Sequence, residues 1–135
     1  VKDNCDSGQF IAIQKAAAAA LDNESIPQQV RSKYRRRMEK LVTTLTNCGW
    51  QCEFPGGSYF LYTKAPKGIT GSHTFNNAED ASQYLITEQA IVTVPWDDAG
   101  PFLRFSVTYV ADDETAEDAL MAETEARLKD VAFEF

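Results

Sequence analysis

The sequence is poor in the residue types that several common catalytic and metal sites require. It contains one histidine, His73, and three cysteines among 135 residues. Because no serine or cysteine nucleophile motif accompanies that histidine, hydrolysis by a catalytic triad has little support. Cys48 and Cys52 have no second pair of ligands beside them, so structural zinc is not expected. A glycine-rich phosphate-binding loop is missing too. The residues by themselves therefore predict no catalytic set and no metal site.

Long hydrophobic segments are also missing. The longest purely apolar run, residues 16–21, is far shorter than the roughly 20 residues that a membrane-spanning helix needs. Residues 1–4 do not resemble the start of a secretory signal, because no apolar segment follows a basic one. Three cysteines cannot all pair within one chain, which fits a reducing compartment. We therefore expect a cytoplasmic protein without a membrane partner.

The net charge of −7 comes entirely from the end of the chain. Residues 111–135 contain nine acidic and two basic residues, whereas residues 1–110 are balanced. Nucleic-acid binding needs a positively charged face, and the main basic cluster lies between Arg31 and Lys40. We interpret this cluster as a solvated helix face that pairs with acidic neighbours. Nucleic acid is not an expected partner, and binding through this cluster is the last of the alternatives.

Apolar residues recur at spacings of three and four in four stretches, which predicts four helices. The first is expected to have Ser7 as its N-cap and to continue to Leu21, and the second to run from residue 26 until Gly49 ends it. Asn77 is the predicted cap of the third helix. The fourth, residues 115–129, is expected to be acidic, with a solvated outer face and four residues turned inward: Ala119, Ala122, Ala126 and Leu128.

Four short strands are expected between these helices, over residues 50–54, 59–63, 90–94 and 102–109. Residues 64–76, which contain a proline and two glycines, are expected to form a loop. The resulting order, ααββαββα, predicts an α+β fold in which helices cover a small, mainly antiparallel sheet.

Arg104 is the most informative single residue. Strand alternation places it on one face with Phe102 and Ser106, while apolar residues occupy the other face. Burying an unpaired guanidinium is very costly, and its fork of donors matches a carboxylate in bidentate geometry. Two interpretations follow: a structural salt bridge to an acidic side chain of the protein, or capture of the carboxylate of a ligand.

Two further segments could lie near Arg104. Gly56 and Gly57 predict either a hairpin turn that needs positive φ or a place where the backbone approaches a ligand closely. Trp96, Asp97 and Asp98 immediately precede the strand that carries Arg104, so their side chains could lie at the same mouth, although Asp98 also has the position of an ordinary turn former.

Several segments, in this order and spacing, resemble the C-terminal part of a fold-type I, pyridoxal-phosphate-dependent aminotransferase of class I/II. The resemblance covers essentially the whole chain, and its best-defined segments are residues 6–14, 34–37, 56–60 and 94–95 followed by 103–106. The sequence of residues 94–100 resembles the corresponding segment in the branch of LL-diaminopimelate and aspartate aminotransferase-like enzymes.

The resemblance implies a division of labour between this chain and residues N-terminal to it. Arg104 would hold the substrate α-carboxylate, and residues 56–60 and 95–98, among them Gly57, Tyr59 and Trp96, would line the mouth of the site. The Schiff-base lysine and the residues that hold the cofactor would lie in a large domain before Val1, so this chain would contain no catalytic and no cofactor-binding residue. Residues 1–25 would be the end of an interdomain helix region and residues 26–135 the small C-terminal domain.

The whole protein would then be a homodimer that uses pyridoxal 5'-phosphate to transfer an amino group between an amino acid and a 2-oxo acid. The isolated chain would bind no cofactor and would be inactive. The alternative is a non-catalytic α+β protein-interaction module with Arg104 in a structural ion pair. The surroundings of Arg104 distinguish the two: a carboxylate of its own domain favours the module, and an open concavity favours the aminotransferase.

Overall fold

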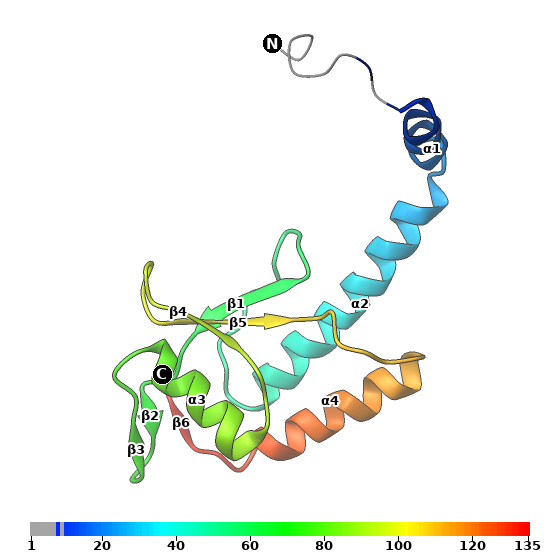
Figure 1. Cartoon of the computed structure of the whole chain (residues 1–135). Helices are drawn as coiled ribbons and strands as arrows, with labels where there is room; N and C mark the ends of the chain where they lie inside the picture. The colour runs from blue at the N-terminus through cyan, green and yellow to red at the C-terminus, as the bar shows by residue number, and fades with distance from the viewer. Residues whose placement is uncertain (1–7, 9) are drawn as a thin grey trace. The chain divides into compact units, whose positions relative to one another are not determined.

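The computed structural model describes residue 8 and residues 10–135, and Figure 1 shows the whole chain. These residues form four helices and six short strands in the order ααβββαββαβ. The strands make two three-stranded sheets, in which each strand pairs antiparallel with its neighbours. The α+β class and the antiparallel pairing are confirmed, whereas the predicted order lacked three of the short strands and contained one, over residues 50–54, that is not formed.

The chain divides into two compact units, residues 1–33 and residues 34–135. The first unit contains α1 (Ile11–Leu21) and the beginning of α2 (Ser25–Asn47). Five consecutive alanines favour helix here, because alanine loses the least conformational freedom in a helix. No residue of α1 is buried, and Phe10 is its N-cap residue. The expected cap, Ser7, lies outside the described residues, and the domain boundary expected after residue 25 stays a prediction.

The larger sheet of the second unit has the order β1-β5-β4. Its strands are β1 (Phe60–Lys64), β5 (Phe102–Ser106) and β4 (Val94–Trp96). Burial alternates along β5, with Leu103 and Phe105 buried and the residues between them more exposed. This confirms the predicted alternation, which places Arg104 on the face that looks away from the core.

The smaller sheet has the order β3-β2-β6. It consists of β2 (Gly68–Ile69), β3 (His73–Thr74) and β6 (Phe133–Glu134). The expectation that residues 64–76 form a loop was therefore wrong for these two pairs of residues and for Lys64, which ends β1. Strands this short are held by pairing with the distant C-terminal segment, which local sequence does not reveal.

The strand expected over residues 50–54 is not formed. Trp50 is instead a core residue, only 2% exposed, and its ring meets Phe105, Phe133 and Phe135 at centroid distances of 5.2–5.5 Å. The apolar Trp50 of this segment is therefore held by side-chain packing in the core and not by strand pairing. The strand expected over residues 90–94 is displaced to β4, because Ala90 adopts the left-handed conformation that ends α3 (Ala78–Gln89).

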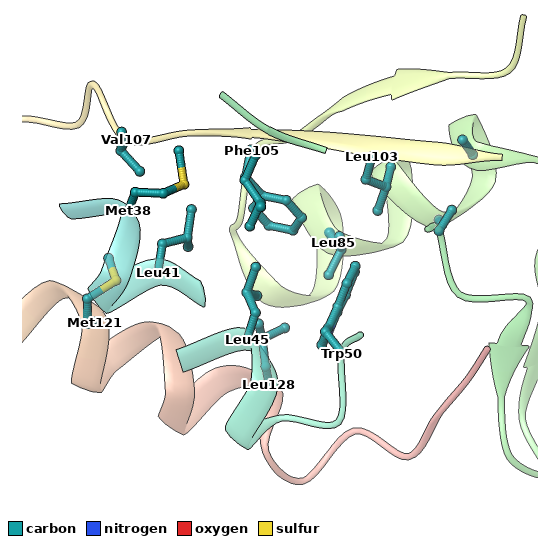
Figure 2. Packing of buried hydrophobic residues seen from close by; sticks show 14 residues of the cluster. Met38, Leu41, Leu45, Trp50, Leu85, Leu103, Phe105, Val107, Met121 and Leu128 are labelled. Atoms are coloured by element: carbon teal, nitrogen blue, oxygen red, sulfur yellow. The ribbon is translucent and has the colours of Figure 1, made fainter. Parts of the chain in front are cut away.

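One face of the larger sheet is covered by helices. In Figure 1, α3 and α4 (Glu114–Leu128) lie on the same side of this sheet. Figure 2 shows Leu103 and Phe105 pointing from β5 toward Leu45 of α2 and Leu85 of α3. Burying a side chain of this size stabilises the fold by about 1.5–3 kcal/mol. Side chains on the opposite face of the sheet, such as Tyr62 and Trp96, are about two-fifths exposed, at 41% and 42%, so they are available for a site.

The helix ends largely follow the predicted signals. The Asn77 side chain accepts a hydrogen bond from the backbone N–H of Asp80 at 2.8 Å, as a cap does. Gly49 has φ of +87° directly after α2, a conformation that glycine adopts without the steric cost of a side chain. Among the described residues, none of the helices has the length and apolar character that crossing a lipid bilayer demands.

The inward face of α4 differs from the prediction. Ala119, Ala122 and Ala126 are exposed, whereas the buried residues of this helix are Glu117, Met121 and Leu128. Only Leu128 was predicted correctly. The helix is rotated so that an acidic side chain enters the interior, where cations of α2 contact it.

Candidate functional site

A hollow of about 650 Å³ lies against the face of the larger sheet that carries Arg104. Residues 53–58, which precede β1, form one part of its wall. Side chains of all three strands complete it: Phe60 and Tyr62 of β1, Trp96 of β4 and Arg104 of β5. Because Tyr62 and Val94 stand opposite Arg104 in the strand register, the arginine occupies the middle of this face.

Arg104 lies in the hollow without an acidic partner from the described residues. Its guanidinium carbon is 4.2 Å from the centroid of the Phe60 ring, and no described carboxylate oxygen comes within 4.0 Å of its nitrogens. A guanidinium stacked on a ring keeps its N–H donors, which lie in its plane, available for a planar acceptor. The geometry therefore provides an open site for a carboxylate and gives no support to a structural ion pair at Arg104.

One acidic residue and one phenol share the hollow with Arg104. Glu53 lines the hollow itself. Partial desolvation raises the pKa of the Tyr62 hydroxyl, the charge of Arg104 lowers it, and the charge of Asp98 raises it, with a net upward direction. Tyr62 consequently stays neutral at physiological pH and can both donate and accept a hydrogen bond there.

The structure brings together three of the four residues predicted for this site. Gly57, Trp96 and Arg104 all line the hollow. Tyr59 is not part of its wall; its ring packs against Phe60 at 4.6 Å and against Tyr34 at 5.8 Å. It thus supports the ring on which Arg104 stacks.

The turn predicted at Gly56 and Gly57 differs in detail. Neither glycine has positive φ, and the residue that does is Ser58, with φ of 76°. The hairpin interpretation was wrong, because no strand precedes the turn. A β-carbon added at either glycine would meet nothing within 4 Å, so this part of the wall is open to a neighbouring molecule.

Sequence analysis missed Glu53 and Tyr62 as residues of the hollow. Phe60 and Tyr62 alternate along β1, a signal for one shared face, but only the pairing of β1 with β5 shows that this is the face of Arg104. Glu53 lies in a segment that does not form the strand expected for it, so its position depended on the tertiary structure.

A second cluster of charges joins α2 to α4. Glu117 accepts hydrogen bonds from Arg36 at 3.0 Å and from Arg37 at 2.7 Å, and Lys40 lies 3.3 Å from the same carboxylate. Contacts with Arg36 first, and then with Arg37 and Lys40, lower the pKa of Glu117 to about 2, against the opposing effect of desolvation. The pairing of the basic cluster with acidic neighbours is confirmed, but Glu117 is only 1% exposed, so this contact is buried and not solvated.

Arg37 has further partners in the segment that follows β5. It donates hydrogen bonds to the carbonyl oxygens of Tyr109 at 2.6 Å and Ala111 at 3.2 Å, and its guanidinium lies over the Tyr109 ring. These contacts tie the chain after β5 to α2. Since Arg36, Arg37 and Lys40 have protein partners, they offer little free positive charge to a nucleic acid.

Among the described residues, there is no grouping of three or more metal-binding side chains.

The family follows from comparison with known proteins. Residues 8–122 match the family model for aminotransferase class I and II. The chain belongs to this family. The LL-diaminopimelate aminotransferases of Methanocaldococcus jannaschii and Methanococcus maripaludis are each 46% identical to this aminotransferase chain, over all of its length and 34% of their own. The chain therefore spans about a third of the length of these curated relatives.

Solved structures show the same aminotransferase fold. The aromatic aminotransferase from Pyrococcus horikoshii matches 87% of this chain and 31% of its own, with a TM-score of 0.66 and 24% identity. The aspartate aminotransferase from Rhizobium meliloti matches the same shares of the two chains, with a TM-score of 0.67 and 20% identity. The part of the relatives to which the chain aligns is their C-terminal part.

Membership of this family implies pyridoxal phosphate for the whole protein. The residues that line the hollow include no lysine, the residue type that forms a Schiff base with this cofactor. What they present is an arginine with free donors and a set of aromatic rings. The lining of the hollow therefore fits a carboxylate and supplies no Schiff-base lysine, and we assign no cofactor contact to it.

Proposed function

We propose that this chain supplies the substrate-carboxylate site of a pyridoxal-phosphate-dependent aminotransferase. The whole enzyme would transfer an amino group between an amino acid and a 2-oxo acid. The observation that carries the proposal is Arg104, which lies in an open hollow, stacks on Phe60 and has no acidic partner among the described residues. The family match supplies the reaction class.

In this proposal, Arg104 binds the two oxygens of the substrate carboxylate with two parallel N–H donors. Both substrates carry that carboxylate, so one site serves the amino acid and the 2-oxo acid alike. Phe60 holds the guanidinium plane, and the strand fixes its position, which limits the freedom that the substrate retains. When bound, the cofactor supplies the electron sink, so the task of this chain is to position the substrate.

The finer assignments rest on the relatives. Two relatives with 46% identity are named LL-diaminopimelate aminotransferase, which supports that substrate, and aspartate is the alternative. We further propose that Gly57, Tyr59 and Trp96 line or support the mouth, that the enzyme is a cytoplasmic homodimer, and that the isolated chain has no aminotransferase activity. The exposed apolar side chains of α1, among them Ile11 and Ile13, are consistent with burial against another part of the enzyme.

The test is to replace Arg104 by alanine in the whole enzyme. Loss of a bidentate, charge-assisted contact should lower kcat/KM by about a hundredfold for every amino-acid substrate. Lys67→Ala is the control, because Lys67 is an exposed cation outside the hollow and should leave kinetics unchanged. Unaltered kinetics in Arg104→Ala would refute the assignment, and turnover by the isolated chain with added cofactor would refute its predicted inactivity.

A further inference from the structure

The strand β4 is attached to α3 by hydrogen bonds on both sides of its three residues. Before the strand, the Ser82 hydroxyl of α3 donates to the backbone carbonyl oxygen of Thr93 at 3.2 Å, and the Thr93 hydroxyl donates back to Ser82 at 3.0 Å. After the strand, the Asp97 carboxylate accepts a hydrogen bond at 2.8 Å from the backbone N–H of Ala78, the first residue of α3. Because Trp96 ends β4 and lines the hollow, both attachments bear on the position of that wall.

The attachment at Asp97 satisfies a donor that has no other partner nearby. The first N–H groups of a helix have no acceptor inside the helix, and Ala78 is 0% exposed, so water does not supply one. The cap residue Asn77 already accepts from the N–H of Asp80. Asp97 reaches Ala78 from 19 positions along the chain. This hydrogen bond therefore joins the end of β4 to a buried helix start, and losing it would leave a buried donor unpaired.

The same residue sets the backbone on which Trp96 stands. Asp97 follows Trp96 directly, and its carbonyl oxygen accepts from the N–H of Gly100 at 3.2 Å in the turn that leads to β5. Trp96 stands opposite Phe102 in the strand register, and its ring meets Tyr62 at a centroid distance of 6.2 Å. The ring is about two-fifths exposed, so these contacts restrain it only in part. The hydrogen bond of Asp97 supplies a further restraint on this part of the wall.

We propose that Asp97 is a positioning residue, which holds Trp96 in the wall of the hollow by tying the end of β4 to the first turn of α3. The proposal rests on the proposed function, because it takes the hollow as the place where the substrate binds. Asp97 is not among the residues that line the hollow, so it acts through Trp96 and not by contact with substrate. A wall that is already in place does not have to be ordered on binding, so the substrate binds more tightly.

The experiment measures steady-state kinetics of the whole enzyme with LL-diaminopimelate or L-aspartate, whichever the wild type converts faster. Asp97→Ala should raise KM about threefold to tenfold, the range that corresponds to the net contribution of one hydrogen bond. It should change kcat less than about twofold, because the wall contacts the substrate alike in the ground state and in the transition state. Asp97→Asn keeps an oxygen that can accept from the N–H of Ala78, so its KM should stay within about twofold of wild type.

Asp113→Ala is the matched control. Asp113 accepts a hydrogen bond from the backbone N–H of Ala116 at the same distance, 2.8 Å, at the start of α4 and outside the hollow. Both alanine variants should lower the melting temperature, but only Asp97→Ala should raise KM. A double-mutant cycle tests the route through the ring: in a Trp96→Ala background, Asp97→Ala should raise KM no further.

The outcomes separate this proposal from the proposed function. If Asp97→Ala leaves KM unchanged while Arg104→Ala lowers kcat/KM, the role of Asp97 is overturned and the proposed function stands. The role of Asp97 is also overturned if Asp113→Ala raises KM as much, if Asp97→Asn is as impaired as Asp97→Ala, or if the effect persists without the Trp96 ring. If Arg104→Ala leaves the kinetics unaffected, the proposed function itself fails. A rise in KM that is confined to Asp97→Ala and depends on Trp96 supports the assignment.

Discussion

Replacing Glu117 by glutamine removes the negative charge that three cations of α2 share. Glu117 is 1% exposed and lies within 3.3 Å of Arg36, Arg37 and Lys40. The variant keeps nearly the same shape, so packing changes little. The variant is less stable because Arg37, whose side chain is only 3% exposed, is left in the interior without its acidic partner.

The magnitude follows from the pKa of Glu117. The surrounding cations lower this pKa from 4.5 to about 2, and each unit corresponds to about 1.4 kcal/mol, so the ionised form is favoured by about 3 kcal/mol. The partial exposure of Arg36 and Lys40 makes this figure an upper value, because solvent screens their charges. We expect Glu117→Gln to lower the free energy of unfolding by about 2–3 kcal/mol at pH 7.

The pH dependence has a definite sign. Because the folded state lowers the pKa of Glu117, its contribution is fully present above the ordinary value of 4.5 and is lost as the pH falls toward about 2. The difference in stability between the wild-type chain and Glu117→Gln should therefore be constant above about pH 5 and shrink between pH 5 and pH 2. Urea unfolding followed by far-ultraviolet circular dichroism at several pH values measures it.

Glu123→Gln is the matched control on the same helix. Glu123 is 59% exposed in its pair with Arg127, so its replacement should change the free energy of unfolding by less than about 0.5 kcal/mol. The reasoning would be refuted if Glu117→Gln were as mild as this control, or if the difference from wild type did not shrink below pH 5.

Two further predictions concern packing. Leu45 lies in the core with 0% exposure, so Leu45→Ala should lower the free energy of unfolding by about 2–5 kcal/mol, as measured by urea unfolding. A decrease of less than about 1 kcal/mol would contradict the burial of this α2 residue in the core. Gly68→Ala should lower the melting temperature and weaken the smaller sheet, because the added β-carbon would collide with the backbone carbonyl oxygen of His73. Gly57→Ala is the control and should leave the melting temperature unchanged, because the added atom meets nothing within 4 Å. Equal effects of the two substitutions would refute the close approach at Gly68.

The sequence indicated Arg104 and part of the wall of the hollow, but not the full set of residues that line it. The alternation that sets Arg104 apart from Leu103 and Phe105 is local, because successive strand residues point to opposite faces. Whether the arginine met a protein acid or open space depended on residues far away in the chain. Tyr62 and Glu53 entered the hollow through strand pairing and through the path of residues 50–58, and neither of these is encoded in a short pattern.

The sequence by itself determined the features that arise within one element. The spacing of apolar residues set the helices, Asn77 and Gly49 set two of their ends, and the ordered segments around Arg104 indicated the aminotransferase resemblance. These depend on contacts between residues a few positions apart, so a local pattern contains them.

Only the tertiary structure decided the features that need two distant segments. The burial of Glu117 follows from the three cations of α2, since an acid enters the interior only where partners compensate for its lost hydration. The two-residue strands β2, β3 and β6 exist because they pair with one another, and residues 50–54 form no strand because Trp50 is used in the core. In each case the deciding free energy belongs to a contact that the linear sequence does not display.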